Sequence, residues 1–120
     1  MKKIYYLLFL SSLTSLAQTQ IGSDINGEAA NDYSSRSVSL SSDGSIIAIG
    51  AAQNNGSGTD DAGHVRVYQN ISGVWTQIGA DINGEAANDQ SGRSVALSSD
   101  GTIGIASNSG SDKGIYYTLF

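Results

Sequence analysis

The chain contains no cysteine and no proline, and His64 is the single histidine among its 120 residues. Without cysteine, no disulfide can stabilise a small core, even in an oxidising compartment. One histidine excludes a histidine cluster for zinc and a serine–histidine–aspartate set in each half of the chain. The sequence has no phosphate loop and no nucleophile elbow. We therefore predict no catalytic, cofactor-binding or metal-binding residues, and we do not expect an enzyme.

Aromatic residues are also scarce, at 8% of the chain, and Trp75 is the only tryptophan. A domain of about 100 residues must bury roughly two-thirds of its unfolded surface to fold alone. We therefore predict that Trp75 is the most buried aromatic residue and closes the core of the first half of the chain against the second.

Basic residues are few, and the net charge is −5. Beyond position 17 the basic residues are Arg36, Arg66, Arg93 and Lys113. Binding to phosphate backbones requires clustered lysine and arginine, so nucleic acid is excluded as a partner. An excess of acidic over basic residues is consistent with solubility outside the cell or with loops that attract cations.

No apolar run is long enough to span a membrane, which takes about 20 residues. The longest N-terminal run, Ile4–Leu10, follows Lys2 and Lys3 and leads into small residues that end at Ala17. This pattern predicts a signal peptide over residues 1–17, cleaved before Gln18, and hence a secreted or cell-surface protein. An uncleaved N-terminal anchor is the alternative.

The chain carries an internal repeat. Gln20–Ser45 reappears as Gln77–Thr102, shifted by 57 positions, with 21 of 26 residues identical. Repetition at such a period is typical of repeat architectures. We divide the chain into a signal peptide (1–17), a first repeat (18–79) and a second, incomplete repeat (80–120).

Each repeat contains short alternating runs separated by turn residues, which predicts an all-β protein. An Asp43-Gly44 step links the first two runs and favours a tight turn. A polar surface loop is expected over 51–63. The strands expected in the first repeat are 37–41, 45–50, 64–68 and 74–79. Four antiparallel strands per 57 residues correspond to one propeller blade.

Three motifs resemble those of a known family: Gly92–Leu97 (GRSVAL), Ile47–Ala51 (IAIGA) and Gly63–Tyr68 (GHVRVY). Their type and order are similar to the FG-GAP repeats of integrin-α-like β-propellers. The resemblance covers nearly all of the first repeat and about three-quarters of a second. It implies antiparallel four-stranded blades of a partial propeller, about one and three-quarter repeats of 57 residues, and a binding role.

The calcium loops of that family are missing here. The corresponding connections contain one carboxylate each, Asp43 and Asp100, whereas calcium takes six to eight oxygen ligands. We predict that both are turn residues. Two further acidic segments, Asp24/Asn26/Glu28 and Asp81/Asn83/Glu85, place oxygen atoms at alternate positions. Turns are the preferred interpretation of these segments, and cation binding stays open.

Asn31-Asp32 and Asn88-Asp89 precede the first strand of each repeat. A short aspartate side chain can accept backbone N–H bonds there from the serine-containing turn that follows, so we predict a structural role. Arg36 and Arg93 are candidates to pair with Asp32 and Asp89.

The second repeat diverges after Thr102. Ile103 and Ile105 stand where the first repeat has Ile46 and Ala48, and Gly114–Phe120 replaces the third strand. When the third strand of each repeat is aligned on the glycine that precedes it, Gly63 or Gly114, Ile115 corresponds to His64. We interpret this end as a truncated or frameshifted part of a longer array, with a short cap as the alternative.

Uncovered sheet faces then predict association with further propeller repeats or self-association. The expected function is a secreted or cell-surface module that contacts an extracellular protein or glycan, as in adhesion. The alternatives are a purely structural extracellular repeat and a non-catalytic part of a secreted hydrolase.

Overall fold

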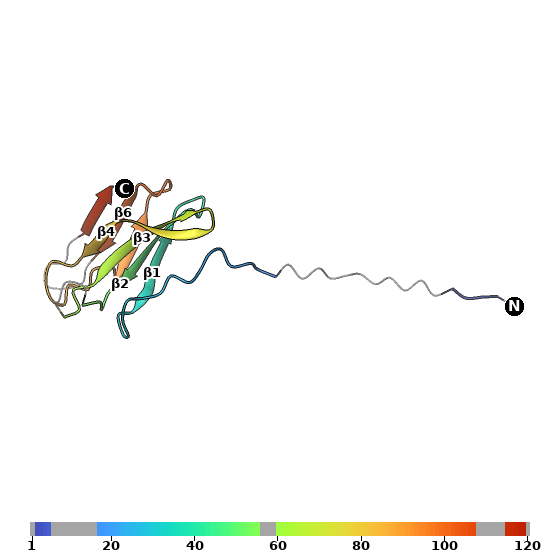
Figure 1. Ribbon diagram of the computed structural model, residues 1–120, viewed down its shortest axis with the longest axis horizontal. Coiled ribbons are helices and arrows are strands. Elements are labelled where there is room, and N and C mark those ends of the chain that lie inside the picture. The colour runs from blue at the N-terminus through green and yellow to red at the C-terminus, as the bar shows by residue number, and fades with distance from the viewer. Residues whose placement is uncertain (1, 6–16, 56–59, 108–114, 120) are drawn as a thin grey trace.

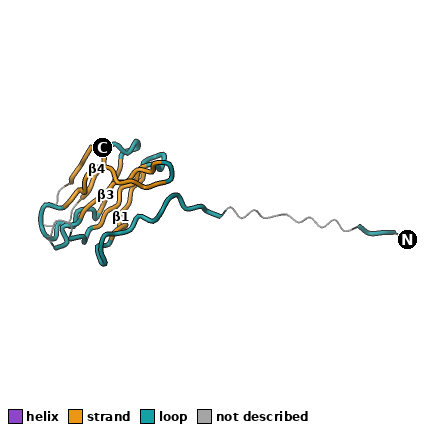
Figure 2. The backbone as a smooth tube through the Cα atoms, viewed as in Figure 1, coloured by secondary structure: helices purple, strands orange, loops and turns teal. Residues whose placement is uncertain are grey.

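The computed structural model describes residues 2–5, 17–55, 60–107 and 115–119, and the described part is built from strands and loops (Figures 1 and 2). Most of the predicted signal peptide, part of the 51–63 loop and the ends of the Gly114–Phe120 segment lie outside the described residues. Within the described residues, no helix has the length and apolar character needed to cross a membrane.

The first repeat forms a four-stranded antiparallel sheet in which each strand pairs with the next along the chain, in the order β1-β2-β3-β4. Its strands are β1 (Ser34–Leu40), β2 (Ile46–Ala51), β3 (His64–Ile71) and β4 (Val74–Asn83). The prediction of an all-β fold with an antiparallel four-stranded sheet is confirmed.

The second repeat forms a three-stranded antiparallel sheet of β5 (Ser94–Leu97), β6 (Ile103–Ser107) and β7 (Ile115–Leu119). β5 lies against β1 and β2, so the two sheets are packed on each other. Ser107 pairs with Ile115, and its repeat equivalent Gly50, 57 positions before it, pairs with Val65. Ile115 therefore takes the place of Val65, and the expected correspondence with His64 is wrong by one position.

β4 runs on to Asn83, past Gly79, where we expected it to end. Ile78 pairs with Val67 and Ile82 pairs with Val65, with an irregularity between them. Gly79 lies at this irregularity with φ of 70°, a left-handed conformation that glycine adopts without steric cost. The bulge lets both isoleucines pack on the core, which explains why the strand continues.

The two turns predicted at Asp43 and Asp100 are confirmed, and they are built alike. Asp43 accepts hydrogen bonds from the Ser45 N–H (2.9 Å) and from the hydroxyls of Ser41 and Ser45 (2.8 Å each). Asp100 accepts the equivalent bonds from Ser98 and Thr102. The backbone N–H of Ser45, with the two hydroxyls, lowers the pKa of Asp43 to about 2.

The core lies between the two sheets. Ala48, Val65 and Val67 are its buried centre. The partly buried residues packed against them are Ile46, Ile78 and Ile82 from the first sheet and Val95 and Leu97 from β5. Two serines of β1 face the same interface: Ser37 Oγ donates to the Gly92 carbonyl (2.8 Å), and Ser39 Oγ accepts from the Leu97 N–H (2.9 Å).

The opposite face of β1 carries Val38 and Leu40, which are 53% and 56% exposed. Cross-strand pairing places Ile47, Ile49, Arg66 and Tyr68 on this same face of the first sheet. We call it the outer face. Trp75 pairs with Asn70, two residues beyond Tyr68, and therefore also belongs to the outer face. The prediction that Trp75 closes the core against the second repeat is wrong, because its side chain faces away from the second sheet.

Candidate functional site

The segment that precedes β1 covers part of the outer face. Residues 25–28 lie over Ile49, His64, Arg66 and Tyr68. At the start of the segment, the Trp75 indole Nε1 donates to the Ile21 carbonyl at 3.0 Å. Gly22 has φ of 76° and lies against the Gly73 carbonyl and the Trp75 ring, where a Cβ would clash. The segment is thereby attached to the β3–β4 hairpin.

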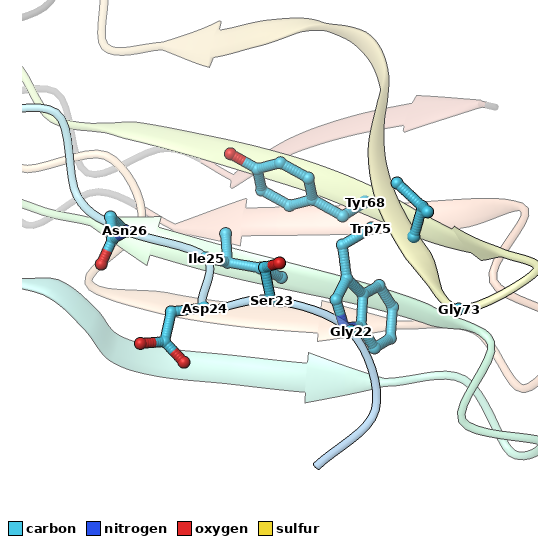
Figure 3. Close-up of a pocket in the computed structure, with 9 residues that line it drawn as sticks. Gly22, Ser23, Asp24, Ile25, Asn26, Tyr68, Gly73 and Trp75 are labelled. Atoms are coloured by element: carbon cyan, nitrogen blue, oxygen red, sulfur yellow. The ribbon is translucent and has the colours of Figure 1, made fainter.

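A pocket of about 310 Å³ lies between this segment and the hairpin (Figure 3). Its lining residues are Gly22, Ser23, Asp24, Ile25 and Asn26 from the segment and Tyr68, Gly73, Val74 and Trp75 from β3, β4 and their turn. The Asp24 carboxylate accepts a hydrogen bond from Gln20 Nε2 at 2.8 Å. The pocket therefore combines two aromatic rings with short polar side chains.

A cluster of charged residues lies next to this pocket on the outer face. Arg66 of β3 donates from Nε and one terminal nitrogen to the two carboxylate oxygens of Asp81, at 3.0 and 2.8 Å, and it also contacts Glu28. Gln77 adds a hydrogen bond to Asp81 at 2.6 Å. The hydrogen bonds that Arg66 donates lower the pKa of Asp81, and donating to the Asp81 and Glu28 carboxylates raises the pKa of Arg66.

His64 borders the cluster and is buried, with 3% of its surface exposed. Its Nδ1 lies 3.9 Å from Glu28 Oε2, which is beyond hydrogen-bond distance. Burial, together with the nearby positive charge of Arg66, lowers the pKa of His64. The imidazole is therefore neutral at pH 7. Asn54 Nδ2 donates to Glu28 from the other side, at 3.2 Å.

Glu28, His64 and Asp81 each place one ligand atom within 4.8 Å of the others. These are the residues of the described chain that could approach one metal ion. Arg66, however, already donates to both carboxylates and supplies their counter-charge. A cation would have to displace the guanidinium, so the geometry fits an ion-pair network better than a metal centre.

The two acidic segments proposed from the sequence do not act as separate units. Asp24 bonds to Gln20, whereas Glu28 of the same segment joins Asp81 of the other one through Arg66. Sequence inspection missed Arg66, His64 and Asn54 as members of the site. They lie between the repeated segments, and their neighbours are 15 to 38 residues away along the chain.

Asp32 and Asp89 have the structural role predicted for them. One oxygen of Asp32 accepts the N–H bonds of Glu28 and Ala29, at 3.0 and 3.2 Å, and the other accepts the Ser34 N–H at 3.1 Å. Burial raises the pKa of Asp32, but these backbone donors outweigh it, and the pKa is lowered overall. Most donors precede the aspartate, although we expected them to follow it.

Asp89 repeats this arrangement in part: one of its oxygens accepts from Glu85 and Ala86 at 3.1 and 2.9 Å, while the other, Oδ1, is buried without a hydrogen-bond partner in the described part of the chain. Arg36 lies over the Tyr33 ring, 5.9 Å from its centre, and Arg93 donates to Gln90 at 3.0 Å. Arg36 forms no ion pair with Asp32 in the described part of the chain, so that predicted pairing is wrong.

Comparison with protein families, curated proteins and solved structures finds no match for this chain.

Proposed function

We propose that the chain is a secreted or cell-surface repeat module of the integrin-α-like β-propeller type, with an adhesion-like role. In this proposal the two sheets are blades, and the pocket between the 22–26 segment and the β3–β4 hairpin binds an extracellular glycan. An extracellular protein is the alternative ligand.

The pocket carries this proposal. Tyr68 and Trp75 offer aromatic surface, while Ser23, Asp24 and Asn26 offer hydroxyl, carboxylate and amide groups. A sugar ring has an apolar C–H face and a rim of hydroxyls, so it needs both kinds of contact. Aromatic rings with one apolar and one wet side are suited to such surfaces. The volume of about 310 Å³ is at the lower end for small-molecule sites and fits one or two sugar rings.

A binding experiment with immobilised neutral and acidic oligosaccharides tests the proposal. We expect the protein to be retained by at least one class. Trp75→Ala should weaken retention by about tenfold, because it removes the larger ring. Tyr33→Ala is the matched control, since Tyr33 is an exposed aromatic residue that does not line this pocket.

Absence of retention by every glycan, or equal retention of the Trp75→Ala and Tyr33→Ala proteins, would contradict the glycan site. Trp75→Phe provides a second variant that keeps a ring in place. It should retain more binding than Trp75→Ala, provided both proteins show the same circular dichroism as the parent.

One observation favours the structural alternative. The hydrogen-bonded loops around Asp32 and Asp89 are alike, and the second one joins the repeats: Ser91 N–H donates to the Ala62 carbonyl at 2.8 Å and Gly84 N–H donates to the Gly63 carbonyl at 2.9 Å. In the structural alternative, these contacts assemble the repeats and the pocket binds no ligand.

A further inference from the structure

Residues 20–26 repeat the sequence of a strand without forming one. Their sequence, QIGSDIN, differs from QIGADIN at 77–83 in one residue. Residues 77–83 form the second part of β4 and pair with β3. In the described chain, residues 20–26 belong to no strand and instead cross the outer face of the first sheet.

The segment nevertheless keeps two local features of β4. Gly22 has φ of 76°, close to the 70° of Gly79 at the β4 bulge. The hydrogen bond from Gln20 to Asp24, at 2.8 Å, corresponds to the bond from Gln77 to Asp81 at 2.6 Å. Residues 20–24 thus share local conformational features with residues 77–81 of β4. A preformed shape reduces the entropy lost on binding.

In the described part of the chain, the second sheet contains no counterpart of β4, the strand that this segment resembles. β7 takes the place of β3, because Ile105 pairs with Tyr117 as Ala48 pairs with Val67. β3 has β4 on its other edge, whereas no described residue pairs with the other edge of β7. An unpaired edge presents free N–H and C=O groups to an incoming strand.

The repeat also indicates which chain supplies that strand. The 84–92 loop leads from β4 in the first sheet to β5 on the core side of that sheet. By the same geometry, residues 27–35 would lead from a fourth strand in another sheet to β1. That other sheet would lie on the outer face of the first sheet. The chain's own second sheet lies on the core side, so the acceptor is a second copy.

Exposed side chains on the outer face fit this arrangement. Val95 and Leu97 of β5 pack on Ala48, Val65 and Val67 of the preceding sheet. The equivalent residues of β1, Val38 and Leu40, are more than half exposed. A second copy placed against the outer face would cover them as the first sheet covers Val95 and Leu97.

We propose that residues 20–26 of one copy add as a fourth strand to the free edge of β7 in a second copy. The β3–β4 ladder gives the register: Gln20 opposite Thr118, Ile21 opposite Tyr117 and Ile25 opposite Ile115. Strand addition of this kind gains main-chain hydrogen bonds together with side-chain burial. The contact joins unlike surfaces, so it propagates into a ring or a filament. Residues 22–26 also line the pocket, so this contact and ligand binding share the segment. The two tests below contain no glycan and therefore report on the contact alone.

Cysteine cross-linking tests the register, because the chain has no cysteine of its own. One preparation carries Ile21→Cys, and a second, of different tagged mass, carries Tyr117→Cys. Mixing under mild oxidation should give a disulfide-linked heterodimer as the main product. The matched control pairs Ser23→Cys with Tyr117→Cys, which the register separates. No heterodimer, or equal yields from the two pairs, would overturn the proposal.

Sedimentation of the full chain gives a second test. The parent should associate as its concentration rises to about 100 µM. Ile25→Asp should weaken association by about 100-fold or more, because the equivalent Ile82 packs on the core of its sheet and a charge cannot be buried there. Ser23→Asp adds the same charge at a position whose equivalent, Ala80, is exposed, and should associate like the parent. A monomeric parent, or equal association of the two variants, would overturn the proposal.

Discussion

At the scale of single residues, Arg66 and His64 are the outer-face residues that contact both the segment before β1 and the sheet. Arg66 joins Glu28 from the segment before β1 to Asp81 of β4. His64 lies beneath Glu28 and is kept neutral by burial. The same few atoms therefore hold the 20–28 segment near the sheet, and we expect them to make the stability of the fold depend on pH.

His64 should make the free energy of unfolding depend on pH near neutrality. Its pKa is lowered in the folded protein, so the unfolded chain binds the proton more readily. The stability is fully present above the unfolded pKa of about 6.5 and declines as pH falls below it, by at most about 1.4 kcal/mol per pH unit. Urea unfolding at pH 7.5 and 5.5 measures the loss.

The His64→Gln protein is the control for this pH effect, because glutamine does not titrate. It should lose less stability than the parent between pH 7.5 and 5.5. An equal loss in both proteins would show that another group causes the dependence.

Replacing Arg66 should destabilise the fold. Arg66→Met leaves Glu28 and Asp81 close together without a counter-charge, and we expect a loss of about 2 kcal/mol at pH 7, since the cluster is only partly buried. Arg36→Met removes a charge that forms no ion pair in the described residues and should change stability by less than about 0.5 kcal/mol. Denaturant midpoints compare the two variants, and similar values would argue against the network.

At the scale of elements, the turns and loops of the two repeats resemble each other more closely than their strands do. The turns at Asp43 and Asp100 use the same hydrogen bonds in both repeats, and the loops at Asp32 and Asp89 share the two bonds to one carboxylate oxygen. Each is made within a few residues of sequence. The strands differ in what covers them, because β5 packs on the core and β1 presents Val38 and Leu40 to solvent.

Asp89 should contribute to the stability of the second repeat. Asp89→Ala removes the acceptor of two backbone N–H groups at a fully buried position, and we expect it to cost about 2 to 3 kcal/mol. Asp89→Asn keeps one oxygen acceptor and should cost less. Thermal unfolding of both variants provides the measurement. An Asp89→Ala protein as stable as the parent would contradict the structural role.

At the scale of the whole molecule, the two sheets share one interface and leave others open. The core side of the first sheet is covered by the second sheet, while, of the described residues, 21–28 cover part of the outer face. Open apolar faces and free strand edges favour association.

Association should make the melting temperature depend on protein concentration, because a partner that binds only the folded chain stabilises it by mass action. We expect the melting temperature of the parent to rise between about 5 and 100 µM and that of Ile25→Asp to change less. Scanning calorimetry at several concentrations gives the comparison. A melting temperature that is the same at every concentration would show that the chain does not associate.

The sequence alone was sufficient for the features that depend on near neighbours. Alternating residues predicted the strands, the 57-residue repeat predicted two similar sheets, and Asp-Gly steps predicted the turns at Asp43 and Asp100. The structural role of Asp32 could be anticipated for the same reason, since its acceptor atoms reach only residues close by. Local periodicity determines which side chains share a face of a strand.

Periodicity does not determine which of the two faces is packed, and only the tertiary structure decided this. It placed Ser37 and Ser39 in the interface and Val38 and Leu40 outside it, although apolar residues are the usual choice for a core. It also turned Trp75 towards Ile21 and brought Glu28, Arg66 and Asp81 together. These outcomes depend on contacts between residues far apart in the chain, whose geometry is set only when the sheets and the segment pack together.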